Sequence, residues 1–177
     1  ETEIRLRTEY PTYFQMRYSS VEQSIESFQE KINPNVTVVK YFFIDNNLNA
    51  LVLTKNTSNL FSIDAENISE EIQTIQQEAH DVTAIGSALH RLYVKLWEPL
   101  KEAIKTNEII IIPDGLLYNL SFEALATKPI TSYNQLADNS LLSKHRISYD
   151  FSLQILARKK EFDSIRANYV GFAPGFT

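Results

Sequence analysis

Four consecutive isoleucines at positions 109–112 form the clearest apolar run in the chain. The run is too short for an ordinary helix and is β-branched throughout, which is typical of a strand covered on both faces of a parallel sheet. We therefore expect it to be the most buried strand. Pro113, Asp114 and Gly115 come next. Proline presets φ, aspartate can bond the backbone ahead of it and glycine accepts positive φ, so the pattern predicts a tight turn directly after the strand.

Three further segments, 36–44, 48–54 and 60–63, have the composition of strands, and short polar connections join them. An antiparallel meander is the economical arrangement for three such strands. Apolar residues recur at helical spacing over residues 20–32, 68–79 and 84–104. The first of these helices would start at a capping box of Ser20 and Gln23. The third has the strongest periodic signal, and we expect it to pack across the sheet.

The last third of the chain continues the alternation of strands and helices. Residues 121–126 should start a short helix, and residues 127–143, rich in Asn, Ser and Thr, are expected to be an exposed loop. A strand at 146–149, a helix at 151–160 and a final strand at 167–172 follow. The whole pattern predicts an α/β fold, with a mixed sheet flanked by helices and an N-terminal antiparallel meander.

Domain organisation is expected to be simple. Residues 1–19 would be the tail of a preceding element, and residues 20–177 would form one domain. The first residue is Glu rather than Met, and together with the missing leader this favours an excised piece of a longer polypeptide. No apolar run is long enough for a membrane span, and no signal peptide opens the chain, so we expect a cytoplasmic protein without a membrane partner.

Charge and composition exclude several classes of function. A net charge of −5 leaves no basic stripe for a nucleic-acid partner. The absence of cysteine excludes disulfides, thiolate metal sites and a thiol nucleophile within this chain. No phosphate-binding glycine motif and no metal-ligand spacing occur, so we expect neither a cofactor nor a metal.

Few residues are candidates for chemistry. The histidines His80, His90 and His145 are interpreted as surface or interfacial residues, because none sits in a recognisable catalytic or metal motif. Asp114 lies at the end of a buried strand, where α/β proteins often bind ligands, but its role in the turn already explains it. Ser121 has no identifiable base and is not in a nucleophile elbow. The residues themselves therefore predict no catalytic site.

The order of several short motifs resembles the N-terminal part of a CHAT domain, the caspase-like domain associated with tetratricopeptide repeats. The matching segments span roughly residues 85–177 and include Leu92-Tyr93, the turn at 112–117, the segment 120–125, the strand at 147–149 and the end of a strand at 171–174. The family-motif positions, all with a structural role, are Pro113, Asp114, Gly115, Leu120, Phe122, Glu123, Leu125 and Tyr149. Ser121 departs from the pattern, because the family usually has proline there.

The resemblance implies a caspase-like (pseudo-caspase) fold and a cysteine peptidase whose His-Cys dyad follows the segment matching 171–174. We therefore expect this chain to be the non-catalytic lobe, a scaffold for a C-terminal catalytic half of the same protein and a contact surface for a regulatory protein. A CHAT-like interaction or signalling module without proteolysis is the alternative. A small hydrolase using Ser or Asp is the third and weakest hypothesis.

Overall fold

A computed structural model describes residues 24–45, 47–77 and 81–158 of the chain. Its centre is a single sheet of five strands in the order β3-β2-β1-β4-β5. The strands are β1 Val36–Ile44, β2 Asn47–Leu53, β3 Ser58–Ile63, β4 Glu108–Ile112 and β5 Arg146–Tyr149. β1, β2 and β3 pair antiparallel, which confirms the predicted meander, and β4 runs parallel to both β1 and β5. The sheet is therefore mixed, and the fold is α/β.

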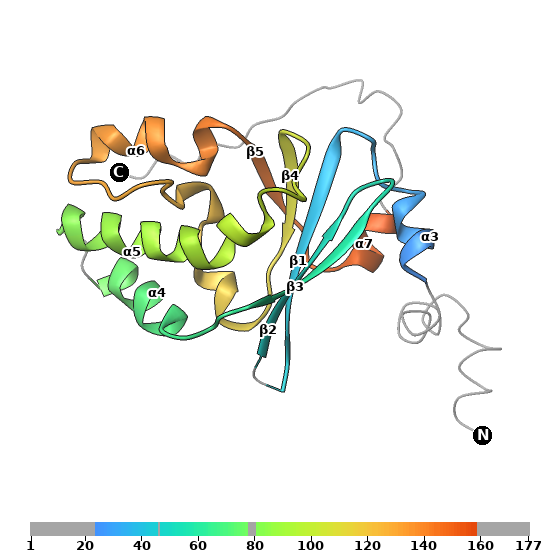
Figure 1. Ribbon diagram of the computed structural model, residues 1–177, viewed down its shortest axis with the longest axis horizontal. Coiled ribbons are helices and arrows are strands. Elements are labelled where there is room, and N and C mark those ends of the chain that lie inside the picture. The colour runs from blue at the N-terminus through green and yellow to red at the C-terminus, as the bar shows by residue number, and fades with distance from the viewer. Residues whose placement is uncertain (1–23, 46, 78–80, 159–177) are drawn as a thin grey trace, which may run out of the picture.

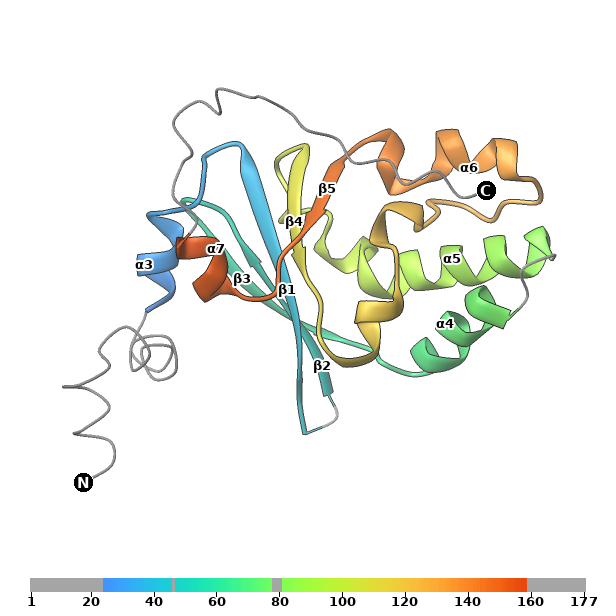
Figure 2. The same cartoon turned by 180° about the vertical axis from the view of Figure 1, so that it is seen from behind.

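Helices lie on both sides of this sheet (Figures 1 and 2). The helices are α3 Ile25–Gln29, α4 Ile68–Gln77, α5 Val82–Leu96, α6 Tyr133–Asn139 and α7 Leu153–Arg158. α4, α5 and α6 lie on one side, while α3 and α7 lie together on the other. Short 3-10 turns complete the structure: η2 Glu98–Leu100, η3 Gly115–Asn119, η4 Phe122–Ala124 and η5 Leu141–Ser143.

The sheet contributes side chains to two separate cores, because successive side chains of a strand point to opposite faces. Val39 of β1 and Ile111 of β4 belong to the larger core on the α4 and α5 side. Val38 and Ile112 belong to the smaller core, which is closed by α3 and α7. A continuous apolar run is needed where both faces are covered, and β4 is the one strand of this sheet with no exposed residue. The prediction that residues 109–112 form the most buried strand is confirmed.

One predicted helix was too long. The apolar stripe from 84 to 104 belongs to α5, which ends at Leu96, and to η2 and the turn after it. Pro99 explains the end, because proline cannot donate an intrahelical hydrogen bond and its ring clashes with the preceding turn. Trp97, Leu100 and Ile104 nevertheless stay buried, so the chain changes its hydrogen bonding while keeping its apolar side on the core.

The expectation of an exposed loop at 127–143 was wrong. This segment contains α6 and η5, and the side chains of Ile130 and Leu141 are almost completely buried. Gly86 of α5 makes the packing possible, since a Cβ atom there would lie 2.3 Å from Cγ1 of Ile130. Most polar residues of the segment are exposed, and their number gives no sign in the sequence of the two buried side chains.

The remaining predicted elements match the helices and strands of the structure in part. The strands at 36–44 and 146–149 have the predicted bounds. The short helix expected at 121–126 is the 3-10 turn η4, and the helix at 151–160 is α7 within the described residues. Only α3 is described from the helix expected at 20–32, and it is capped by Ser24. The predicted tail 1–19, Ser20 and the predicted strand 167–172 lie outside the described residues.

Among the helices of residues 24–45, 47–77 and 81–158, none combines the length and apolar character needed to cross a bilayer.

Candidate functional site

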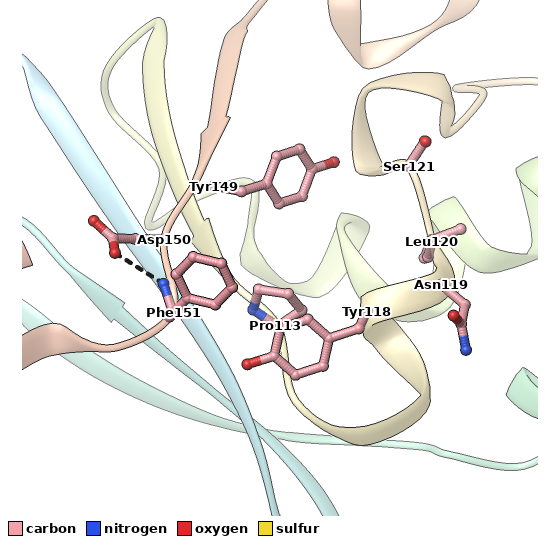
Figure 3. Close-up of a pocket in the computed structure, with 8 residues that line it drawn as sticks. All are labelled: Pro113, Tyr118, Asn119, Leu120, Ser121, Tyr149, Asp150 and Phe151. Carbon is pink, nitrogen blue, oxygen red and sulfur yellow. Dashed lines mark hydrogen bonds between the residues drawn. The ribbon is translucent and has the colours of Figure 1, made fainter. Parts of the chain in front are cut away.

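A pocket of about 390 Å³ opens at the carboxyl ends of the adjacent parallel strands β4 and β5 (Figure 3). This edge of a parallel sheet is where α/β proteins commonly bind ligands. Eight residues line the pocket: Pro113, Tyr118, Asn119, Leu120, Ser121, Tyr149, Asp150 and Phe151. They come from the turn after β4 and from the end of β5, so the parallel pairing of the two strands brings them together.

Asp114 fixes the turn below this pocket. Its Oδ2 accepts the backbone N–H of Phe43 on β1 at 3.1 Å, and its Oδ1 accepts the N–H of Gly115 at 2.9 Å. Gly115 has a φ of 53°, and a Cβ atom at this position would lie 3.3 Å from Cε2 of Phe43. Both residues therefore have the turn geometry that the sequence predicts. The carboxylate is occupied by backbone donors.

The segment 120–125 alternates between the core and the surface. Leu120, Phe122 and Leu125 are buried, and the ring of Phe122 stacks on Tyr41 at 5.1 Å between centroids. The Tyr41 hydroxyl in turn donates to the carbonyl of Leu96 at 2.7 Å. These contacts join the segment to β1 and to the end of α5, and they hold one wall of the pocket against the core.

Tyr149 connects the end of β5 to η4. Its hydroxyl accepts the backbone N–H of Phe122 at 2.8 Å and donates to the Glu123 carboxylate. Partial burial, followed by the hydrogen bond to Glu123, raises the pKa of Tyr149 far above its ordinary value of 10.0. The phenol therefore stays protonated and acts as a fixed hydrogen-bonding strut.

Sequence reasoning did not identify four lining residues, Tyr118, Asn119, Asp150 and Phe151. Asp150 is 5% exposed, and its Oδ1 accepts the N–H of Phe151 at 2.8 Å. Phe151 and Tyr118 present rings that are 76% and 54% exposed. An acid directly after a predicted strand was the available signal for Asp150, whereas the two aromatic residues follow no periodic pattern.

The histidines lie elsewhere. Nδ1 of His90 is 3.0 Å from the carbonyl oxygen of Ala126 and helps to hold the chain after η4 against α5. His145 precedes β5, at the opposite end of that strand from the pocket, and its ring lies 5.3 Å from that of Trp97. His80 lies outside the described residues. Ser121 lines the pocket, but none of the eight lining residues is a histidine.

The lining of the pocket contains groups that can contact a ligand. The lining offers ring faces, three hydroxyls, an amide and a carboxylate, and none of its eight residues is a histidine, lysine or cysteine. Within the described part of the chain, no group of three or more His, Asp or Glu side chains could hold a metal ion. Neither a protein-family model nor a curated protein matches the sequence.

Proposed function

We propose that this chain is the non-catalytic lobe of a CHAT-type, caspase-like cysteine peptidase and acts as a scaffold for the half that carries the His-Cys dyad. The observation that carries the proposal is the ordered set of motifs from Leu92-Tyr93 to 171–174. Its described part occupies a helix, a buried parallel strand, the turn after it and the next parallel strand. Caspase-like domains are built on such parallel strands flanked by helices.

Two features of the described residues support a scaffold role. Most motif residues are occupied by structural contacts: Asp114 bonds β1, Phe122 lies in the core and Tyr149 bonds Phe122 and Glu123. The sequence also contains no cysteine. Because the thiolate is the nucleophile of a cysteine peptidase, a second segment must provide it.

The edge of the sheet is a suitable place for that second segment. Within the described residues, β5 is the outermost strand beside β4, and three of its four residues are exposed. An open strand edge is a template for pairing with another strand. We therefore expect the catalytic half to associate through the edge of β5. A cytoplasmic location is part of the proposal and can be tested by fractionating cells that express the parent protein.

The test combines this chain with a separately made C-terminal segment of its parent. Association is measured by analytical ultracentrifugation, and activity is measured as cleavage of a peptide library. We expect no cleavage by this chain alone and thiol-sensitive cleavage by the mixture. A segment in which the proposed nucleophile is changed from Cys to Ser is the matched control, because it should associate without cleaving. Hydrolysis by the repurified chain alone, unaffected by a thiol-directed inhibitor, would refute the scaffold role.

A protein-contact module without proteolysis is the second candidate, and the exposed rings of Tyr118 and Phe151 favour it. The reading frame beyond residue 177 separates the two candidates. A strand ending in His-Gly and a later strand ending in Cys would support the peptidase. Association of the two segments without either residue would support the contact module.

A further inference from the structure

The pocket at the ends of β4 and β5 collects exposed aromatic rings. Tyr118, Tyr149 and Phe151 line it with exposed fractions of 54%, 42% and 76% (Figure 3). Single exposed apolar side chains are common on protein surfaces, but several rings around one hollow are typical of a binding site. The rings offer their faces to a ligand.

Hydrogen bonds fix the hydroxyl of Tyr149 and the backbone that carries Phe151 and Tyr118. The Tyr149 hydroxyl is bonded to the Phe122 N–H and to Glu123, and the N–H of Phe151 is bonded to Oδ1 of Asp150 at 2.8 Å. Tyr118 belongs to η3, whose first residue is capped by Asp114. A pocket with walls fixed in this way loses little conformational entropy when it binds a ligand.

Acidic side chains lie in and next to the lining of the pocket. None of the eight lining residues is basic, and one of them, Asp150, is acidic. Asp114 adjoins the lining residue Pro113, and Glu123 accepts the hydroxyl of the lining residue Tyr149. The chain as a whole carries a net charge of −5. Ring faces and carboxylates both attract cations, so charge complementarity favours a positively charged ligand.

Volume limits the size of this ligand. Pockets for drug-sized molecules and cofactors measure about 300 to 1,000 Å³. At about 390 Å³ this pocket is near the lower limit. It fits one long side chain better than a large cofactor.

We infer that the pocket binds the guanidinium group of an arginine side chain in an extended segment of a protein partner. Arginine is favoured over lysine because its planar group stacks on aromatic faces and is more weakly hydrated. The inference goes beyond the scaffold role. It rests on the pocket alone and holds whether or not the parent is a peptidase.

Short acetylated and amidated alanine peptides with one central residue are the probes. The central residue is arginine, citrulline or phenylalanine, where citrulline keeps the shape of arginine without its charge. Binding to the full chain is followed by nuclear magnetic resonance of the aromatic side chains. The arginine peptide should shift the Tyr118 and Phe151 signals and bind about ten-fold more tightly than the citrulline peptide. Equal binding of citrulline, or tighter binding of phenylalanine, would overturn the inference.

Substitutions of the aromatic lining residues test whether the arginine peptide binds in this pocket. Tyr118→Leu and Phe151→Leu keep an apolar side chain but remove a ring face, so each should weaken arginine binding about three-fold and the double variant about ten-fold. Tyr133→Leu is the matched control, because Tyr133 is 56% exposed and does not line the pocket. Its affinity for the arginine peptide should equal that of the unmodified chain. Unchanged affinity in the double variant, or an equal loss in the control, would contradict the inference. Thermal midpoints establish that all variants fold.

Discussion

The hydroxyl of Tyr149 accepts the backbone N–H of Phe122 at 2.8 Å. The two residues belong to β5 and η4, which α6 and η5 separate along the chain. One side chain therefore joins the end of the outer parallel strand, β5, to the segment that follows β4. The bond to Glu123 fixes the same hydroxyl from a second direction.

Tyr149→Phe should lower the free energy of unfolding by about 1 to 2 kcal/mol, because the Phe122 N–H loses its acceptor. Glu123→Gln retains an oxygen that can accept from Tyr149, so its cost should be below about 1 kcal/mol. Both values can be measured by urea unfolding. A larger loss in Glu123→Gln than in Tyr149→Phe would show that the carboxylate, and not the backbone bond, dominates this contact.

Gly86→Ala should destabilise the protein by about 1 to 3 kcal/mol, the usual cost of overpacking. The new Cβ would lie 2.3 Å from Cγ1 and 2.4 Å from the carbonyl oxygen of Ile130, and the backbone oxygen cannot rotate away. The sign of the change in the free energy of unfolding is informative, because a glycine-to-alanine change in an unobstructed helix stabilises a protein by about 1 kcal/mol. A higher thermal midpoint for Gly86→Ala would mean that the 127–143 segment does not pack against α5 as described.

Asp114→Ala should cost about 1 to 2 kcal/mol, because the N–H groups of Phe43 and Gly115 both lose their acceptor. Asp114→Asn should cost roughly half as much, since one amide oxygen can serve only one of the two donors well. Urea unfolding of the two variants tests the order. If Asp114→Asn were as stable as the unmodified protein, one of the two hydrogen bonds of Asp114 would contribute nothing to stability.

Folding stability should depend on the protonation of His145. Burial holds the pKa of His145 below its ordinary value of 6.5. A hydrogen bond with the backbone of Thr106 opposes this, and the charge of Lys144 adds a smaller lowering effect. The folded state therefore prefers the neutral imidazole. This contribution is fully present above about pH 6.5 and is lost as the pH falls through the lowered folded-state pKa.

His145→Phe is the variant that isolates this effect, because phenylalanine keeps a ring against Trp97 but cannot take up a proton. Urea unfolding should be compared at about pH 7.5 and about pH 5 for both proteins. The unmodified chain should lose more stability on acidification than the variant. Equal losses would exclude His145 as a source of acid sensitivity.

Ile111→Asp should prevent folding. The side chain is 0% exposed in the larger core, and an unpaired carboxylate there would cost several kcal/mol, comparable with the whole stability of a small domain. Ile111→Val, which removes one methyl group, should cost only about 0.5 to 1.5 kcal/mol. Circular dichroism and thermal melting distinguish the two outcomes. A cooperative melt of Ile111→Asp near the normal midpoint would contradict the burial of β4.

Periodicity predicted which side chains are buried better than it predicted the hydrogen bonding of the backbone. The apolar stripe through Trp97, Leu100 and Ile104 is real, although α5 ends at Leu96. At 127–143 the sequence predicted neither the helix nor the burial. α6 itself has no buried residue, and the buried side chains are those of flanking residues such as Ile130 and Leu141. A polar composition therefore hid an ordered segment.

The site was predictable only where its chemistry is local. The bond between Asp114 and Gly115 follows from the rules for a tight turn, whereas the bond from Asp114 to Phe43 of β1 joins residues far apart in the sequence. The meeting of Tyr118 with Phe151 depends on the parallel register of β4 and β5, in which Ile111 is paired with Tyr149. No local pattern in the sequence encodes that register.

The parallel pair of β1 and β4 has a consequence for the order of folding. These neighbours are separated in the chain by β2, β3, α4 and α5, whereas the meander is formed from strands that follow one another directly. Closing a long loop loses chain entropy before any stabilising contact has formed, so non-local strand pairs form slowly. The hairpin of β1 and β2 should therefore form early in folding. β4 and the pocket that depends on it should assemble late, which makes the ligand site the part of the molecule most sensitive to incomplete folding.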